Sequence, residues 1–216
     1  MAAPDTSAAV SRAMRTLLER REAERRDGAL GIGWKIGFDT PAIQEHFGLS
    51  EAVVGYLTDS RVVAPGDTVS LAGWVAPAVE VELAARVGDD GEIAGIGPAF
   101  ELVDLDIDFS DIEPVLAGNV CHRRVVFGEE VNGIDPMAFA ATVTKDGVAV
   151  AEGRLTKDPS VTVAFARSFL AAHGAELEPG QRIICGSIVP PVAVVPGDEL
   201  RVDFGPFGRL SVAFSA

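Results

Sequence analysis

The sequence predicts a β-dominated α+β fold with few peripheral helices. Many short runs rich in Val, Ile, Phe and Thr are separated by turn signals, such as the Pro-Gly-Asp sequences at residues 65–67 and 196–198. Apolar residues at helical spacing mark two longer segments, at residues 7–26 and 159–173. With 216 residues, of which 48% are hydrophobic, the chain can bury a core of its own.

The first expected element is an amphipathic surface helix over residues 7–26. Val10, Met14, Leu17 and Leu18 recur at helical spacing among Arg and Glu side chains. The β-rich part begins soon afterwards, and no repeat, low-complexity stretch or linker interrupts it. We therefore expect an N-terminal helical segment, residues 1–31, followed by a single β-rich domain, residues 32–216.

The expected strands follow one another along this domain. They cover residues 34–38, 68–71, 75–87, 99–107, 125–127, 140–144, 148–154, 181–185, 200–204 and 209–214. A short helical pattern occupies residues 41–47. A second long helix is expected at residues 159–173, because Pro159 lies near its first turn and Gly174 just beyond its end.

Composition and charge argue against several classes of partner. The formal net charge of -14 argues against nucleic acids and anionic membrane surfaces, since both are bound through basic patches. No uninterrupted apolar segment is long enough to span a bilayer. The two cysteines, Cys121 and Cys185, match neither a disulfide framework nor a zinc-ligand spacing, and the N-terminus lacks a basic segment leading into an apolar run. We expect a cytoplasmic protein.

The segment APAVEVELAARV, residues 76–87, is the most informative part of the chain. It places Glu80 and Glu82 two residues apart in an apolar strand, so both side chains point to the same face. Buried carboxylates side by side need a shared proton, a basic partner or a divalent metal. Oxygen ligands favour Mg2+, Ca2+ or Mn2+. The alternative is an edge strand whose two glutamates face water.

A lysine between two glycines is the second unusual feature. In the expected strand at residues 34–38, Lys35 points away from the apolar side chains, with only Gly33 and Gly37 beside it on its own face. Glycine in a strand often marks the close approach of a ligand or of another backbone. We expect a gap beside Lys35 that an anionic ligand fills. The alternative is a surface lysine whose stem lies along a glycine-rich edge strand.

A lone carboxylate on an apolar stripe is the third unusual feature. In the expected strand at residues 99–107, Glu101 shares its face with apolar side chains, which is costly unless the carboxylate has a partner. Asp104, Asp106 and Asp108 fall on the opposite face and are expected to face solvent.

Several segments, in a fixed order, carry a resemblance to a known family. They are GWKIGF (33–38), GYLTD (55–59), PAVEVE (77–82), FELVD (100–104), AGNVC (117–121) and CGS (185–187). The chain resembles the fumarylacetoacetate hydrolase superfamily from about Ile32 onward, and within it the branch of the 2-keto-4-pentenoate hydratases and 4-oxalocrotonate decarboxylases. The resemblance implies a mixed β-sandwich roll and makes the β-rich domain the catalytic one.

The resemblance also implies a site. Glu80, Glu82 and Glu101 match the carboxylates that hold Mg2+ (or Mn2+), Lys35 and Asp59 match catalytic positions, and Asn119, Cys121 and Ser187 match substrate-binding positions. The implied activity is that of a metal-dependent lyase that hydrates, dehydrates or decarboxylates a small 2-oxo acid or its enol through a metal-stabilised enolate. We also expect a homo-oligomer.

Departures from the pattern of the branch leave two alternatives open. Gly118 and Cys121 stand where hydratases commonly have Asp and Ser, and a thiol is the weaker hydrogen-bond donor. The chain begins late relative to typical hydratases, and its segment between Glu82 and Glu101 is too short for the usual helix, so less material is expected over the pocket. The alternatives are a C-C bond hydrolase of acylpyruvate-type substrates and a catalytically silent partner subunit. Retention of the three glutamates and Lys35 argues against the silent subunit.

The histidines are weaker candidates for the site. His46 is either a lid residue or an exposed helix position, and the exposed position is favoured. The orientation of His122, toward the site or toward the exterior of the sheet, stays open.

Overall fold

The computed structural model describes residues 6–216. In chain order its elements are α1 (Thr6–Arg26), β1 (Gly31–Gly37), α2 (Pro41–Phe47), β2 (Val53–Thr58), the 3-10 helix η1 (Asp59–Arg61), β3 (Val62–Val63), β4 (Thr68–Ser70), β5 (Pro77–Val87), β6 (Ile93–Asp104), α3 (Ile112–Ala117), β7 (His122–Phe127), β8 (Ala141–Lys145), β9 (Val148–Gly153), α4 (Pro159–Ala172), β10 (Arg182–Ile184), β11 (Val192–Ala193), β12 (Glu199–Asp203), the 3-10 helix η2 (Gly205–Phe207) and β13 (Arg209–Ser215). The predicted β-dominated α+β fold is confirmed.

The larger of two sheets curls until its edges approach each other. Within residues 6–216 it has eight strands, in the order β2-β1-β10-β5-β6-β7-β3, with β11 paired to β5 beside this path. Strands β2 and β3 stand at opposite ends of this order, yet only the three residues of η1 separate them in the chain. Three residues reach roughly 11 Å, so the two edges must lie close together. A small apolar cluster agrees with this closure, because Leu57 of β2 packs with Val125 of β7 and Ile184 of β10.

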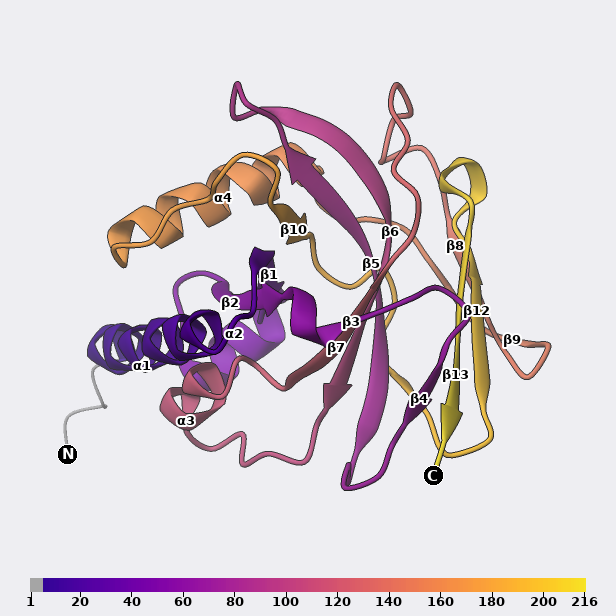
Figure 1. Ribbon diagram of the computed structural model, residues 1–216, viewed down its shortest axis with the longest axis horizontal. Helices are drawn as coiled ribbons and strands as arrows, with labels where there is room; N and C mark the ends of the chain where they lie inside the picture. The colour runs from indigo at the N-terminus through magenta and orange to yellow at the C-terminus, as the bar shows by residue number, and fades with distance from the viewer. Residues whose placement is uncertain (1–5) are drawn as a thin grey trace.

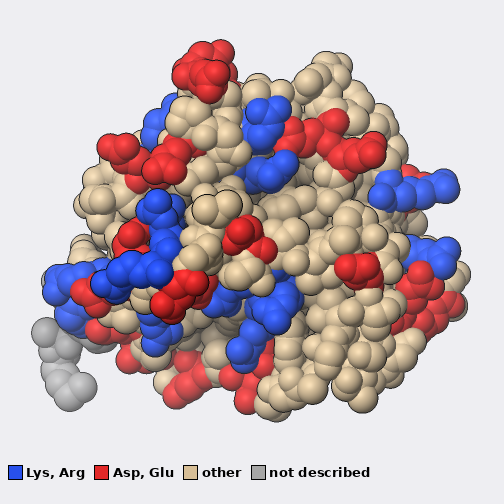
Figure 2. Space-filling view, viewed as in Figure 1, with Lys and Arg blue, Asp and Glu red and all other residues tan. Residues whose placement is uncertain are grey.

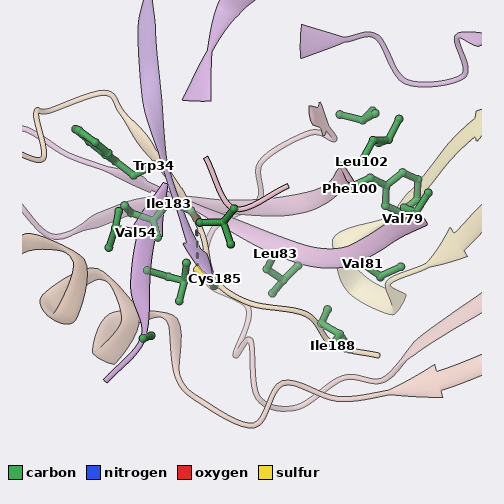
Figure 3. Packing of buried hydrophobic residues seen from close by; sticks show 14 of the residues in the cluster. Trp34, Val54, Val79, Val81, Leu83, Phe100, Leu102, Ile183, Cys185 and Ile188 are labelled. Carbon is green, nitrogen blue, oxygen red and sulfur yellow. Dashed lines mark hydrogen bonds between the residues drawn. The ribbon is translucent and has the colours of Figure 1, made fainter. Parts of the chain in front are cut away.

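The two faces of the larger sheet differ in the size of their side chains. The outer face carries bulky residues of the main core: Trp34, Val54, Val79, Val81, Leu83, Phe100, Leu102 and Ile183 (Figure 3). On the inner face, small residues stand in register beside the charged ones: Gly55 pairs with Lys35, and Ala99 with Glu82. Small side chains allow a tight curl and leave room inside it. The inner face therefore has space for polar groups.

The smaller sheet and the helices cover the outside of the larger one. The order of the smaller sheet is β4-β13-β12-β8-β9, and it lies on one side of the long β5–β6 hairpin, with the helices on the other side (Figure 1). Phe100 of β6 and Phe204, just after β12, join the two sheets with ring centroids 6.2 Å apart. Helix α4 packs against β1, β2 and β10, and α1 packs against α3 and β2.

Most expected elements are present, with shifted ends. All ten expected strands and all three expected helical segments occur, although β6 begins at Ile93 and ends at Asp104, rather than covering residues 99–107. Strands β2, β3 and β11 and helix α3 were not expected. Strands β3 and β11 have two residues each, and β2 contains Gly55, so none of them shows an alternating pattern. The division at residue 31 into a helical segment and a domain stays a prediction.

The connection between β5 and β6 is a tight hairpin turn. Residues 88–92 form it, with Gly91 at a φ of 81° and the Asp90 carboxylate accepting the N–H of Glu92 at 3.0 Å. The expectation that no helix fits between Glu82 and Glu101 is therefore confirmed.

The expected solvent-facing row of aspartates is wrong for its first member. Asp104 is buried, accepts the N–H of Ala76 at 2.9 Å and pairs with Arg123. Asp106 and Asp108 are exposed, as expected. Because β6 ends at Asp104, the strand alternation does not continue through the three residues. Asp104 instead fixes the start of β5 to the end of β6.

The surface carries both signs of charge despite the acidic balance. Figure 2 shows Lys and Arg interspersed with Asp and Glu, most densely over the region of α1 (Figures 1 and 2). Arg12 of α1 pairs with Glu113 of α3 at 2.7 Å, and Arg25 pairs with Glu22 at 3.0 Å. In the described part of the chain, no helix is long and apolar enough to cross a membrane.

Candidate metal centre

Three glutamates of the β5–β6 hairpin meet on the inner face of the larger sheet. Glu80 stands directly opposite Glu101 in the antiparallel pairing, and Glu82 lies two residues further along β5. One carboxylate oxygen from each lies within 4.8 Å of the others. Among residues 6–216, these three side chains are the one set of Asp, Glu, His or Cys residues close enough together to share a metal ion. Glu82 and Glu101 are buried and Glu80 is half-buried. The alternative of an edge strand with both glutamates in water is therefore wrong.

Lys35 reaches this cluster from β1. Its side chain is buried, with 1% of the residue surface exposed, so the alternative of a surface lysine is wrong. Its Nζ pairs with Oε1 of Glu101 and donates to the carbonyl oxygen of Val120 at 3.0 Å. Strands β1 and β6 are not neighbours in the sheet, so the curl is what brings Lys35 to Glu101.

The two glycines beside Lys35 differ in their surroundings. A Cβ atom at Gly33 would lie 2.1 Å from the carbonyl oxygen of Arg182, and one at Gly37 would lie 2.8 Å from Cγ1 of Val120. The expected gap is therefore wrong at Gly33, where the backbone of β10 fills the space. Gly37, by contrast, lines a cavity together with Lys35 and Val120.

His122, whose orientation the sequence left open, points to the cluster. Its Nδ1 lies 2.9 Å from Oε1 of Glu101, and its side chain is fully buried. Burial lowers the pKa of His122, despite the hydrogen bond to Glu101 that raises it. A neutral imidazole then donates from Nδ1 to the carboxylate. Because a bulge shifts the β6–β7 register beside His122, the spacing of residues along β7 gave no signal of this contact.

Burial and mutual repulsion set the protonation of the cluster. Burial, then Glu101, raise the pKa of Glu80 to about 7, and burial, Glu101 and Glu80 raise the pKa of Glu82 well above its usual value. Burial also acts to raise the pKa of Glu101, but Lys35 and His122 outweigh it and the net shift is downward. For Lys35, burial acts to lower the pKa, and Glu101 and Glu80 outweigh it, so the net shift is upward. Lys35 and Glu101 therefore form an ionised pair, whereas burial and repulsion favour the protonated forms of Glu80 and Glu82 in the metal-free protein.

The cluster fits a divalent cation. With all four groups ionised, three carboxylates and one ammonium group leave two negative charges. Oε2 of Glu101 is buried and has no hydrogen-bond partner among the described residues. All of the candidate ligand atoms are carboxylate oxygens, which Mg2+ and Mn2+ prefer.

The cluster opens onto a cavity of about 590 Å³. Lys35, Glu80, Glu82 and Cys121 line it, and Glu101 lies behind them. Residues 186–191 line another part of the wall, where the N–H of Gly186 donates to Oε2 of Glu82 at 2.7 Å. Ser187 lies in this segment and is exposed. Cys121 and Ser187 are thus placed where they can contact a bound molecule.

A left-handed turn connects α3 to β7 beside the site. Asn119, Val120 and Cys121 have φ values of 65°, 50° and 65°, and a positive φ at a β-branched residue such as Val120 is a strained conformation. The turn directs the carbonyl of Val120 to Lys35 and the side chain of Cys121 to the cavity. The resemblance marked these positions, but nothing in the residue types predicted the turn.

The structure does not bring every predicted residue to the cavity. Asn119 is buried, and its side-chain amide binds the backbone of Tyr56. The amide oxygen accepts the N–H of Tyr56 at 2.8 Å, and the amide nitrogen donates to the Tyr56 carbonyl oxygen at 2.9 Å. Asp59 is exposed, accepts the N–H of Leu30 at 2.7 Å and does not line the cavity. Strand β2 pairs Gly55 with Lys35, so its far end, followed by Asp59, lies several residues from the site. His46 is exposed, as favoured.

Comparisons with known proteins agree with this arrangement. No family model matches the chain. The 2-hydroxyhexa-2,4-dienoate hydratase of Comamonas testosteroni is 28% identical over 221 residues, covering 92% of this chain and 83% of that protein. The 2-oxo-hept-4-ene-1,7-dioate hydratase of Escherichia coli is 29% identical over 209 residues, covering 84% of this chain and 78% of that protein.

A solved structure shares the fold. The 4-oxalocrotonate decarboxylase from Pseudomonas putida G7, complexed with magnesium and adipate, matches with a TM-score of 0.84 at 24% identity, covering 94% of this chain and 84% of that one. The roll of the fumarylacetoacetate hydrolase type is thereby confirmed. A 4-oxalocrotonate decarboxylase of a Pseudomonas species is 29% identical over 202 residues, covering 85% of this chain and 78% of that protein. The resemblance to this superfamily, and to its hydratase and decarboxylase branch, is confirmed as well.

Neutralising one glutamate should weaken metal binding. Glu82→Gln keeps the shape of the side chain but removes a charge and a strong oxygen ligand, so affinity for Mg2+ and Mn2+ should fall by more than roughly 100-fold, the upper cost of losing an outer partner of a metal ligand. The melting temperature of the metal-free variant should not fall, because burial and repulsion already disfavour the charged form of Glu82 and a neutral amide has nearly the same shape. Calorimetric titration measures the affinity, and Glu176→Gln, at an exposed position, is the control. Equal binding by both variants would place the metal elsewhere.

Removing the partner of Glu101 should have a smaller effect. His122→Ala leaves the carboxylate oriented by Lys35 alone, so Mg2+ affinity should fall by roughly 10- to 100-fold. His173→Ala, at a half-buried position at the end of α4, should leave the affinity unchanged. The same titration compares them. An unchanged affinity in His122→Ala would show that the imidazole only fills space.

Proposed function

We propose that this chain is a divalent-metal-dependent lyase that acts on a small 2-oxo acid or its enol, by hydration, dehydration or decarboxylation. The observation that carries the proposal is the cluster of Glu80, Glu82 and Glu101 around Lys35 at the wall of a cavity. The similarity of the chain to a dienoate hydratase and a dioate hydratase supports a reaction that adds or removes water.

Glu80, Glu82 and Glu101 would hold Mg2+ or Mn2+ through carboxylate oxygens. When bound, the cation supplies Lewis acidity, which makes a 2-oxo group a better acceptor of electrons from the neighbouring carbon. The N–H of Gly186 holds Oε2 of Glu82 and leaves its other oxygen for the cation. His122 and Lys35 both use Oε1 of Glu101, which leaves Oε2 available.

Lys35 has one ammonium hydrogen left for the substrate. An ammonium group has three N–H donors. Two of those of Lys35 bind Glu101 and the carbonyl oxygen of Val120. Lys35 also lines the cavity, which supports assigning its third N–H to the carboxylate or the 2-oxo oxygen of the substrate. Two protein contacts fix the direction of this donor before the substrate arrives. Lys35 therefore orients the reacting end and stabilises negative charge that develops there.

Cys121 serves as a weak donor rather than as a nucleophile. Burial raises the pKa of its thiol to about 11, with Lys35 acting in the opposite direction. A thiol with this pKa is protonated at neutral pH, and the thiolate is the reactive form. Cys121 and the hydroxyl of Ser187 contact substrate in this proposal.

The alternatives are less well supported. An acylpyruvate hydrolase of this superfamily usually requires a glutamate and a histidine that activate water at a lid, and Glu45 and His46 are such residues adjacent in the sequence. Both are exposed and neither lines the cavity, and Nε2 of His46 lies 2.8 Å from the carbonyl oxygen of Phe109. A silent subunit would have no need to keep a buried cluster of charges that costs stability.

We further propose that the enzyme works in the cytoplasm as a homo-oligomer. Both cysteines are free thiols, as is usual in a reducing compartment. Val148 and Val150 of β9, at the edge of the smaller sheet, are exposed and offer an apolar strip to a second copy.

A direct assay tests the proposed function. Protein loaded with Mg2+ is given 2-hydroxy-2,4-dienoic acids, and NMR follows the addition of water while released CO2 is measured separately. Turnover by the wild type that is lost in Glu82→Gln is the expected result. No turnover of any of these acids with Mg2+ or Mn2+ would contradict it.

Replacing Lys35 should affect both stability and turnover. Lys35→Met leaves Glu101 buried without its counter-ion, and breaking a buried pair in this way costs about 3 to 5 kcal/mol. The melting temperature of the metal-free variant should fall, and Mg2+ should raise it by more than in the wild type. At saturating Mg2+, turnover should stay reduced by roughly 100-fold, the low end for a positioned acid-base or donor group. Full activity of the metal-loaded variant would limit Lys35 to a structural role.

Restoring a hydroxyl at residue 121 should favour simple substrates. Cys121→Ser places a stronger donor on the cavity wall, so turnover of short 2-oxo-4-enoic acids should rise, by roughly 10-fold or more if the bond forms only in the transition state. Cys121→Ala has no donor and should show no such rise. Steady-state kinetics on a panel of 2-oxo acids separates the two. If both variants match the wild type, Cys121 takes no part in specificity.

A further inference from the structure

We infer that the substrate is a 2-oxo monocarboxylate, or its enol, with an apolar far end, and that the reaction is the addition or loss of water rather than of CO2. The inference rests on the proposed function and deepens it. The relatives do not decide the point, because they include a dienoate hydratase, a dioate hydratase and a 4-oxalocrotonate decarboxylase of similar identity. The charges and the apolar wall of this cavity do.

The cavity offers one cationic side chain. Among the described residues that line it, Asp39, Glu80 and Glu82 are acidic and only Lys35 is basic. Lys35 stands beside the carboxylate cluster, so it serves the end of the substrate that carries the 2-oxo acid group. A second carboxylate would find no cation of its own in the wall.

A further cationic side chain close to the cavity is already paired with a carboxylate. Lys157 pairs with Asp39, and Lys157 itself does not line the cavity. Thr40, Thr156 and Ser187 contribute hydroxyl groups to the wall. A hydroxyl donates a hydrogen bond but brings no charge, so these groups would offset only part of the hydration that a carboxylate loses.

Apolar residues form much of the cavity wall. They come from the segment after β1, from α2, from the loop after β6 and from residues 188–190: Phe38, Ile43, Leu105, Phe109, Ile188 and Pro190. Phe47 ties the wall together, with its ring centroid 5.1 Å from that of Phe38 and 6.3 Å from that of Phe109. Moving an alkyl chain from water to such a surface lowers the free energy, whereas moving a carboxylate there raises it.

The absence of a second carboxylate decides between the reactions. When CO2 leaves, the electron pair of the broken bond must reach the 2-oxo oxygen. Loss of the C1 carboxylate leaves that pair on the oxo-bearing carbon itself, where the oxo group does not accept it, so CO2 must come from a second carboxylate conjugated with the oxo group. A monocarboxylate has none.

Addition of water needs only a double bond conjugated with the oxo group. A 2-hydroxy-2,4-dienoate acquires this arrangement when its enol hydroxyl loses a proton, C5 takes one up, and the remaining double bond lies between C3 and C4. The water oxygen bonds to C4, the electron pair between C3 and C4 moves toward the 2-oxo oxygen, and one proton from water leaves. C3 then takes up a proton as the oxo group re-forms. The product contains all the atoms of substrate and water, and no oxidant or reductant is required.

A matched pair of non-reacting ligands tests the inference. Calorimetry on the Mg2+-loaded protein compares 2-oxohexanoate with 2-oxohexane-1,6-dioate, which differ only in a methyl or a carboxylate at C6. The monocarboxylate should bind at least about tenfold more tightly. Equal or tighter binding of the dicarboxylate would overturn the inference.

A cation placed in the apolar wall should reverse the preference. Ile43→Lys introduces an ammonium group from α2 into the cavity and should shift the ratio of the two affinities at least about tenfold toward the dicarboxylate. Ala42→Lys adds the same charge at an exposed position of the same helix outside the cavity lining, and should leave the ratio within about twofold. An equal shift in both variants, or none in Ile43→Lys, would overturn the placement of the far end against this wall.

Turnover separates this inference from the proposed function. The wild type should convert 2-hydroxyhexa-2,4-dienoate to 4-hydroxy-2-oxohexanoate and should release little CO2 from the corresponding 1,6-dioate. Rapid CO2 release from the dioate would overturn the inference and support the lyase proposal. No turnover of either acid would overturn the lyase proposal, and the hydration step with it.

Discussion

Three buried carboxylates held around one lysine are the constraint on which the rest of the structure depends. Like charges on one face of a hairpin repel each other and lose hydration, so the fold must supply compensation. Lys35 and His122 compensate Glu101, and the N–H of Gly186 compensates Glu82. The remaining negative charge makes the site receptive to a divalent cation. The same charge that costs stability in the metal-free protein therefore creates the affinity for metal.

Compensation requires that the larger sheet close on itself. Lys35 lies on β1 and Glu101 on β6, with β10 and β5 between them in the sheet order. Small residues on the inner face permit the curl, and Asn119 secures it by binding both backbone groups of Tyr56 on β2. The left-handed turn that begins at Asn119 also presents the Val120 carbonyl to Lys35. The same turn therefore helps to close the sheet and to orient the side chain of Lys35.

The sequence predicted what lies within single strands and missed what depends on closure. Alternation along β5 placed Glu80 and Glu82 on one face, and alternation along β1 placed Lys35 on the inner face. The contact of His122 with Glu101 depends on a bulge between β6 and β7, which no pattern in either strand encodes. The glycine beside Lys35 was misread for the same reason: whether Gly33 faces a ligand or the backbone of Arg182 depends on which strand becomes its neighbour. Strand alternation also failed where the strand stopped, at Asp104.

The two ends of the cavity have different structural origins. The charged end is set by the register of paired strands, in which Glu80 stands opposite Glu101, so it changes little unless the sheet itself changes. The apolar end is built from connections: Phe38 after β1, Ile43 on α2 and Phe109 in the loop after β6. Connecting segments tolerate substitution far better than paired strands do. A fold of this kind can therefore keep the charged end of its cavity unchanged while the shape and polarity of the other end vary.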